Sequence, residues 1–356
     1  MINTITELST KENITTKRNE RQPSFFYLSN YMYGGCVSFT AHLLHKLMKN
    51  QVFLLSSSPL KKSNRLRDFG YGIHCKKVPL EFIDKIKNPF ITDMYENFHI
   101  LKKLKRSDIT IVIHDCFEIF EENEPYLKYW NIITIRKTIQ NYLKKRYNID
   151  AKFLYHPFYP YPLSYREEKD YDSNDVYCQE HNNHRSGAVS ISRVHYYKNT
   201  DILLEANKKT KNPIKIYGLV NWKYVNNKLD VAQFKKYYYG IFNKSFKATS
   251  SILGKAKFMV DMSTMPHKDG GGTQYTFLEA IHNNSAIILN RRWIEDVDKK
   301  YRDFKEGYNC YAVSNGEELA ELLNNDIDTR KIVQHAKKLM ERHIKADWEK
   351  VVTPAH

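Results

Sequence analysis

DGGGTQYTFLEAIHNNSAIILNRRW, residues 269–293, is the stretch that decides the fold. It opens with an acidic residue and three glycines at 269–272, and Asn283 and Asn284 end the helical pattern that follows. Residues 286–289 are apolar and indicate a short buried strand. The stretch therefore predicts a glycine-rich turn, an amphipathic helix and a core strand. The expected buried positions of the helix are Tyr275, Leu278, Ala280 and Ile281.

A glycine-rich turn ahead of a helix is a possible phosphate site. Glycines let the backbone come close to a ligand, and the free N–H groups of the first helical turn favour an anion such as a diphosphate. Glu279, in the middle of the helix, is placed to accept two hydrogen bonds from a ribose diol. The alternative is a surface loop followed by an ordinary amphipathic helix, and this stretch alone leaves both readings open.

The bulk properties bound the class of protein. A chain of 356 residues is long enough for two domains of ordinary size. Its formal net charge of +16 suggests a polyanionic partner, either nucleic acid or an anionic membrane surface. The alternative is a lysine-rich surface without such a partner.

Cysteine usage and hydropathy predict a cytoplasmic protein, in the host cell if the chain is viral. The five cysteines are scattered and odd in number, which favours reduced thiols. Cys178, His181 and His184 lie close together, but no second cluster completes four ligands, so we expect a polar loop and no metal. The first 24 residues contain no apolar stretch typical of a signal peptide, and no run of 18 apolar residues predicts a membrane span.

Strand and helix patterns alternate along both halves of the chain, which predicts an α/β protein with two doubly wound, Rossmann-like domains facing across a cleft. We expect a mobile extension at 1–24, a first domain at 25–165, a linker at 166–186, a second domain at 187–330 and a C-terminal helix at 331–356. Strands are predicted at 25–28, 52–55, 73–78, 109–113, 132–135, 188–191, 214–217, 258–261, 286–289 and 308–313. Helical character is predicted between 79 and 108 and over 230–243.

A His-Asp pair directly follows the β-branched strand at 109–113. Ligands of open α/β sheets bind beyond the carboxyl ends of the strands, so His114 and Asp115 are site candidates. The alternative is that they are polar loop residues capping a helix.

Densely spaced cations are the candidate contacts for DNA phosphates. A solvated loop is the default reading for the basic stretch at 56–68. The candidates are Lys61, Lys62, Arg65, Arg67, Lys144, Lys145, Arg146, Arg291 and Arg292.

Four motifs occur in a familiar order: YGGCVSFT at 33–40, IHD at 113–115, ISRVHYYKN at 191–199 and QYTFLEA at 274–280. Together they resemble the retaining glycosyltransferases of the GT-B fold, and within that group the DNA α-glucosyltransferases of T-even bacteriophages. The resemblance is patchy but extends over most of the chain. It implies a UDP-sugar donor and a double-stranded DNA acceptor containing 5-hydroxymethylcytosine.

The resemblance also implies roles for individual residues. Arg193 and Lys198 would hold the donor diphosphate and stabilise the leaving group, and Glu279 would bind the ribose. His114 would contact the transferred sugar, and Asp115 would take the proton of the acceptor hydroxyl. The expected donor-binding set is Gly34, Gly35, Arg193, Lys198, Gly218, Gly271, Gly272, Thr273, Gln274, Tyr275, Thr276 and Glu279.

The chain departs from the pattern of the resembled family at two positions. Gly271 stands eight positions before Glu279, where the family has an acidic residue, and Asp269 lies two residues away. Gln274 stands where the phage enzymes have a further acidic residue. The sugar is therefore open between glucose and arabinose. The sequence contains no DxD motif and no evident carboxylate nucleophile, so we expect front-face attack without a required metal.

Three functions remain open. The first is glycosylation of hydroxymethylated DNA, with base flipping. The second is a GT-B glycosyltransferase for a surface or capsid glycan, docked on an anionic membrane. The third is a nucleic-acid binder without catalysis.

Overall fold

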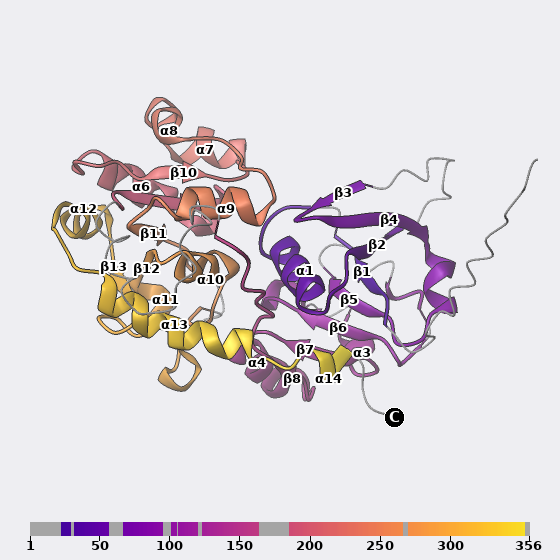
Figure 1. The fold of residues 1–356 in the computed structure, drawn as a ribbon. Helices are drawn as coiled ribbons and strands as arrows, with labels where there is room; N and C mark the ends of the chain where they lie inside the picture. Colours follow the sequence, from indigo (N-terminus) through magenta and orange to yellow (C-terminus); the bar gives the residue numbers. More distant parts are fainter. Residues whose placement is uncertain are drawn as a thin grey trace, which may run out of the picture.

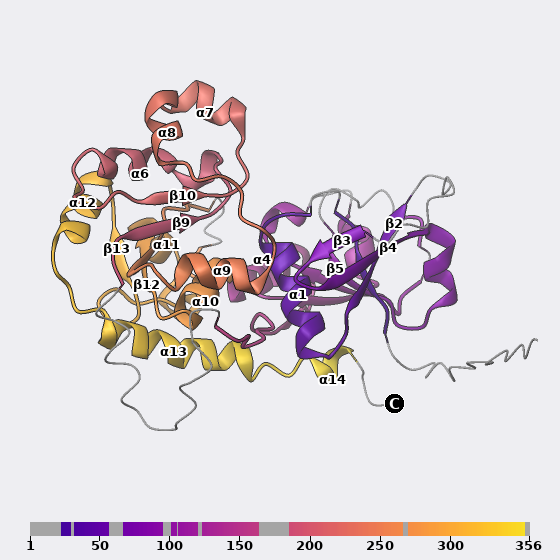
Figure 2. The same cartoon turned by 45° about the horizontal axis from the view of Figure 1, so that its top comes forward.

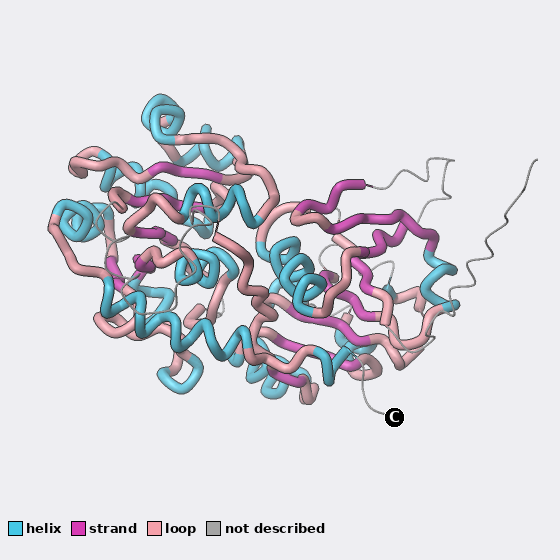
Figure 3. Tube along the Cα trace, viewed as in Figure 1, coloured by secondary structure: helices cyan, strands magenta, loops and turns pink. Residues whose placement is uncertain are grey.

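The computed structural model describes residues 23–29, 32–56, 67–94, 101–104, 106–119, 123–163, 185–265 and 270–352, which build two predominantly parallel sheets. Figure 1 shows the sheets side by side, with helices around each. We call residues 23–163 with their sheet the first half, and residues 185–344 with theirs the second half. Helices and strands alternate in both (Figure 3). The predicted α/β class is confirmed.

The sheet of the first half has the order β3-β4-β2-β1-β5-β6-β7-β8, and every pair is parallel except the β3–β4 pair. Its strands are β1 (Phe25–Tyr27), β2 (Gln51–Ser56), β3 (Arg67–Gly70), β4 (Ile73–Pro79), β5 (Phe90–Asp93), β6 (Thr110–Ile113), β7 (Asn131–Thr134) and β8 (Lys152–Phe153). Its helices are α1 (Gly35–Lys46), η1 (Leu80–Lys85), η2 (Cys116–Glu118), α3 (Glu124–Leu127) and α4 (Lys137–Tyr147).

The sheet of the second half is entirely parallel, with the order β10-β9-β11-β12-β13. Its strands are β9 (Ala188–Ile191), β10 (Lys215–Tyr217), β11 (Phe258–Asp261), β12 (Ala286–Asn290) and β13 (Tyr311–Val313). Its helices are η4 (Tyr196–Lys198), α6 (Thr200–Asn207), α7 (Trp222–Lys228), α8 (Val231–Tyr237), α9 (Phe246–Leu253), α10 (Tyr275–His282), α11 (Arg291–Glu295), η6 (Lys299–Tyr301), α12 (Gly316–Asn324) and α13 (Arg330–Ile344).

Both faces of each sheet are covered, as the strand sequences require. Alternate residues of a strand point to opposite faces, and β6 divides accordingly: Ile111 and Ile113 pack in one core and Val112 in another. The same division splits Met259 from Val260 on β11. The continuous apolar runs therefore predicted fully buried parallel strands correctly.

Two stretches differ from the prediction. Residues 79–108 were expected to be helical, but they contain η1 and the buried strand β5, which lies between β1 and β6 in the sheet. The four residues of β5 are all buried and so lack the alternation that marks a half-exposed strand. The helical pattern over 230–243 ends at Tyr237, and a separate helix, α7, precedes it.

The C-terminal segment joins the two halves (Figure 2). The helix predicted to run to the end of the chain stops at Ile344, and α14 (Glu349–Val352) follows on the first half. Trp348 is completely buried in the same core as Phe25, and its Nε1 donates to the carbonyl of Tyr155 at 2.9 Å. Among the described residues, no helix combines the length and apolar character needed to cross a bilayer.

Candidate active site

The two halves face each other where the glycine turn before α1 meets the loop after β9. Gly34 is the N-cap of α1 with a φ of 89°, and a Cβ placed on it would lie 3.7 Å from Nε of Arg193. Gly34, Gly35 and Arg193 are all exposed. His114 and Asp115 follow β6 of the first half, and Arg193 and Lys198 follow β9 of the second. These loops stand at the carboxyl ends of parallel strands, where ligands bind in such folds.

Lys198 links the loop after β9 to the start of α10. Its Nζ donates to Oγ of Ser263 at 2.7 Å and to Oε1 of Gln274 at 3.2 Å, and it lies 3.5 Å from Oδ2 of Asp261. Burial lowers the pKa of Lys198, and the cations Arg193 and Arg136 act in the same direction. Lys198 therefore connects the loop after β9 with the end of β11 and the start of α10.

Arg136, which the sequence analysis missed, belongs to the first half and lies next to Gly272, in the glycine-rich turn before α10. It precedes α4, directly after β7, and a Cβ placed on Gly272 would lie 3.2 Å from its Cγ. Its guanidinium lies 5.9 Å from the ring centroid of Trp293. Arg136 follows β7, which neighbours β6 in the sheet, so finding it required knowing which strands are neighbours.

Residues of the second half fix the conformation of the glycine-rich turn at 270–272, which precedes α10. Gly271 has a φ of 75°, and a Cβ on it would meet Cγ1 of Val297 at 3.0 Å. Trp293 donates its Nε1–H to the carbonyl of Gly272 at 3.1 Å, and Thr273 donates its hydroxyl to Asp303. The turn is thus fixed in a conformation that glycine adopts without strain. Asp269 lies outside the described residues.

Gly218 occupies a position where only glycine fits. Its φ is 138°, and an added Cβ would lie 1.9 Å from the carbonyl oxygen of Ser192. The residue therefore sets the path of the chain immediately before Arg193.

Glu279, the predicted ribose ligand, lies buried between α10 and α1. Its Oε1 is 3.6 Å from Nε2 of His42, and Nδ1 of His42 accepts the backbone N–H of Tyr159 at 3.0 Å. Nε2 is therefore the protonated nitrogen of the neutral ring and faces the carboxyl group. Burial raises the pKa of Glu279 to about 8 and lowers that of His42.

Two other predicted donor ligands lie on α10, and one of them, Tyr275, packs between the halves. Tyr275 is buried, stacks on the His42 ring with centroids 5.0 Å apart, and donates its hydroxyl to the carbonyl of Pro157 at 2.9 Å. Oγ1 of Thr276 is buried with no hydrogen-bond partner among the described residues.

His114 is held as a neutral ring. Its Nε2 donates to the carbonyl of Thr92 at 2.7 Å, which leaves Nδ1 as the acceptor. Burial lowers the pKa of His114 to about 4. Asp115 is half-buried, and its Oδ1 accepts the backbone N–H of Phe117 at 2.9 Å, so it caps η2. The capping alternative for Asp115 is thus observed.

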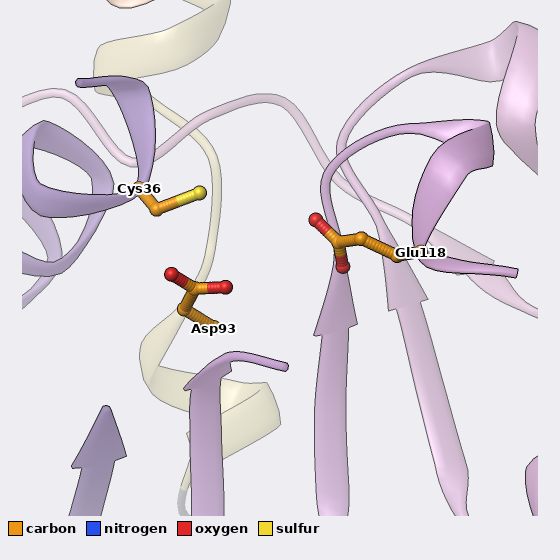
Figure 4. Close-up of side chains that lie close together, drawn as sticks. All are labelled: Cys36, Asp93 and Glu118. Carbon is orange, nitrogen blue, oxygen red and sulfur yellow. The ribbon is translucent and has the colours of Figure 1, made fainter. Parts of the chain in front are cut away.

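A cluster of acidic side chains beside this pair was also missed. Cys36 from α1, Asp93 from β5 and Glu118 from η2 point toward one another (Figure 4), with ligand atoms within 4.8 Å of one another. We call these three residues the acid cluster. Carboxylates other than Asp115 are therefore present at the site. They come from three separate segments, one of which was predicted as a helix.

The predicted DNA contacts fall into three groups. Lys61, Lys62 and Arg65 lie outside the described residues, as does the side chain of Arg67. On α4, Lys144 pairs with Asp150 at 2.8 Å, Lys145 is exposed, and Arg146 lies over the Tyr147 ring. On α11, Arg291 pairs with Glu306 and Arg292 with Asp296.

The cysteine and histidines that lie close together in the sequence, Cys178, His181 and His184, also lie outside the described residues.

Two hollows among the described residues are relevant to the site. One of about 10 Å³ lies beside Arg193, Lys198 and Asp261, which is room for roughly one water. A larger one of 740 Å³ lies between α11 and α13.

No family profile matches the sequence, and no curated protein matches it either. The structure, by contrast, is similar to solved structures of glycosyltransferases. Anabaena HepE in complex with UDP and glucose superimposes with a TM-score of 0.63 at 12% identity, covering 90% of this chain and 95% of that chain. An alpha-glucosyltransferase in complex with UDP and a 13-mer DNA containing an HMU base gives 0.60 at 12% identity, with the same coverage.

WaaG, a glycosyltransferase involved in lipopolysaccharide biosynthesis, gives a TM-score of 0.51 at 11% identity, covering 93% of this chain and 100% of that chain. The chain therefore has the GT-B fold, as the sequence motifs predicted.

Proposed function

We propose that the chain is a nucleotide-sugar-dependent glycosyltransferase that moves glucose or arabinose from a UDP-sugar to 5-hydroxymethylcytosine in double-stranded DNA, with retention. The observation that carries the proposal is a set of three cations at the two glycine-rich turns. Lys198 donates to Gln274 at the start of α10, Arg136 lies against Gly272, and Arg193 lies beside Gly34. Both arginines act electrostatically on Lys198, and His114 and Asp115 follow β6 of the first half. Solved proteins of the same fold hold UDP with glucose or with DNA.

The donor side supplies positive charge where the leaving group forms. As the sugar–oxygen bond breaks, negative charge grows on the diphosphate, and Arg193, Lys198 and Arg136 stabilise it. The backbone N–H groups at the start of α10 add to this effect. The chain's own cations perform this task, so the chemistry requires no metal.

The acceptor side supplies a base and a fixed imidazole. Asp115 accepts the proton of the acceptor hydroxyl as its oxygen attacks the anomeric carbon. His114 keeps its proton on Nε2, facing Thr92, and presents Nδ1 as an acceptor for a sugar hydroxyl. Attack on the same face as the departing diphosphate gives retention.

A DNA acceptor is supported by the net charge of +16 and by the DNA-bound structure of the same fold. Exposed Lys145 and Arg146 at the end of α4 are candidate phosphate contacts. A second candidate function is transfer to a surface or capsid glycan, which the likeness to WaaG favours.

The test is incubation of the protein with hydroxymethylated or unmodified duplex DNA and a panel of UDP-sugars, followed by mass spectrometry of the nucleosides. We expect a gain of one hexose or pentose, only on the hydroxymethylated duplex, and loss of the product with Arg193→Ala. Arg330→Ala, an exposed residue paired with Asp328, is the matched control. Transfer to a glycan primer without transfer to DNA would support the second candidate instead.

A further inference from the structure

The acid cluster lies at the carboxyl ends of β5 and β6, beside His114 and Asp115. Asp93 is 1% exposed and Glu118 is 3% exposed, while Cys36 is half-buried and forms the side nearer to solvent. Figure 4 shows the thiol and both carboxyl groups directed toward a common centre. The cluster is therefore a buried group of acidic side chains next to the loop that carries His114 and Asp115.

Glu118 has an unused acceptor directed into the cluster. Its Oε2 has no hydrogen-bond partner among the described residues, although buried polar atoms nearly always have one. Its carboxyl group is positioned by the backbone N–H of His114. Burial raises the pKa of Glu118, and the nearby Asp115 and Asp93 raise it further. Burial likewise raises the pKa of Cys36. A ligand that donates a hydrogen bond would therefore stabilise these closely spaced acidic side chains.

Two exposed aromatic rings belong to the loops that carry the site residues. Phe117, next to Glu118 in η2, is 42% exposed, and Tyr197 in η4 of the other half is 45% exposed. Their ring centroids are 5.8 Å apart at an interplanar angle of 35°. Exposed aromatic rings are stacking surfaces for unpaired nucleobases.

We infer that the acid cluster receives the exocyclic amino group of a cytosine-type base, with the base ring against Phe117 and Tyr197. This inference rests on the proposed DNA-glycosylating function and names the group by which the site selects its acceptor. An exocyclic amine has two N–H donors, and the carboxyl oxygens of Asp93 and Glu118 are acceptors for them. A uracil-type base has a carbonyl oxygen at that position, which would face the same oxygens without a proton between them.

A divalent cation is the other ligand that a thiol and two carboxyl groups accept. The cluster offers only three ligands, of mixed hardness, whereas structural zinc takes four and magnesium takes six oxygens. The amine accounts for the unused oxygen of Glu118, and a base that carries it accounts for the exposed ring of the adjacent Phe117.

The test compares two duplexes of one sequence, containing either 5-hydroxymethylcytosine or 5-hydroxymethyluracil, as acceptors for the full-length protein. We expect wild type to have a kcat/KM at least about tenfold higher on the cytosine duplex, the effect of one matched base contact. Glu118→Gln replaces one acceptor oxygen with an N–H donor and should bring the ratio to about one or below. Glu81→Gln, the same change at an exposed position, should leave the ratio unchanged.

The two proposals fail in different ways. Absence of transfer to either duplex by wild type would remove the proposed function. Transfer to both with a ratio that Glu118→Gln does not change would remove only the present inference. One equivalent of bound metal in wild type, absent from Glu118→Gln, would also overturn it. Should Glu118→Gln fail to fold, Asp93→Asn carries the same expectation for the ratio.

Discussion

Nε2 of His42 lies 3.6 Å from Oε1 of Glu279, and this contact joins α1 of the first half to α10 of the second. Neither atom has a hydrogen-bond partner among the described residues. The ring is clamped between Phe158 and Tyr275, with centroids 4.5 and 5.0 Å away. Glu279 is also the predicted ribose ligand. One residue therefore belongs both to the contact between the two halves and to the predicted donor site.

The first prediction concerns pH. The folded pKa of Glu279, about 8, is above its usual value, so the protein favours the protonated form. This contribution to stability is fully present below about pH 4.5 and is lost as pH rises toward 8. We expect Glu279→Gln to lose less stability than wild type between these pH values, as measured by urea unfolding. Glu341→Gln, at an exposed position, is the control. Parallel curves for wild type and Glu279→Gln would show that Glu279 is not buried in solution.

The second prediction concerns Arg136. Loss of a cation that stabilises a developing charge costs roughly 10²–10³ in rate. We expect Arg136→Ala to reduce the kcat of sugar transfer by about that factor, and Arg136→Lys to recover part of it. The rate is measured at increasing concentrations of the UDP-sugar with saturating acceptor DNA. Arg330→Ala serves as the control. An unchanged kcat would confine Arg136 to packing against Gly272 and Trp293.

The third prediction concerns Gly218. Gly218→Ala places a methyl group into the carbonyl of Ser192, so we expect it to lower the free energy of unfolding by about 3 kcal/mol or more, or to prevent folding. Gly240 also has a positive φ, but an added Cβ would meet open space there. Gly240→Ala therefore measures the cost of backbone strain without a steric clash. We expect this control to cost about 1 kcal/mol. Equal losses in the two variants would contradict the close approach.

The fourth prediction concerns Trp348. Truncating a fully buried tryptophan costs about 3–5 kcal/mol, so Trp348→Ala should be strongly destabilised in urea unfolding. Trp222→Ala is the matched control, because Trp222 is 48% exposed. A small effect at Trp348 would mean that α14 is not docked on the first half in solution.

The sequence was informative wherever a local pattern sufficed. Apolar runs located β6, β9, β11 and β12. The motifs also named Lys198 and Gln274, whose side chains are hydrogen-bonded in the structure. Local patterns failed where pairing with distant segments decides the conformation. The strand character of β5 comes from its neighbours β1 and β6, not from its own composition.

The missed parts of the candidate site share that cause. The acid cluster combines three segments, and its member Asp93 ends the strand that was predicted as a helix. Arg136 contacts a turn that lies in the other half of the chain. Each of these requires knowledge of which strand ends meet in space.

The docking of Trp348 and α14 on the first half has a topological consequence. The chain enters the second half from the first and returns to the first afterwards, so the second half is an insertion with both of its ends anchored to one folded body. Unfolding of the inserted half alone would produce a closed loop rather than a free tail. Such a loop has less conformational entropy than a free chain, so the anchor favours the folded insertion.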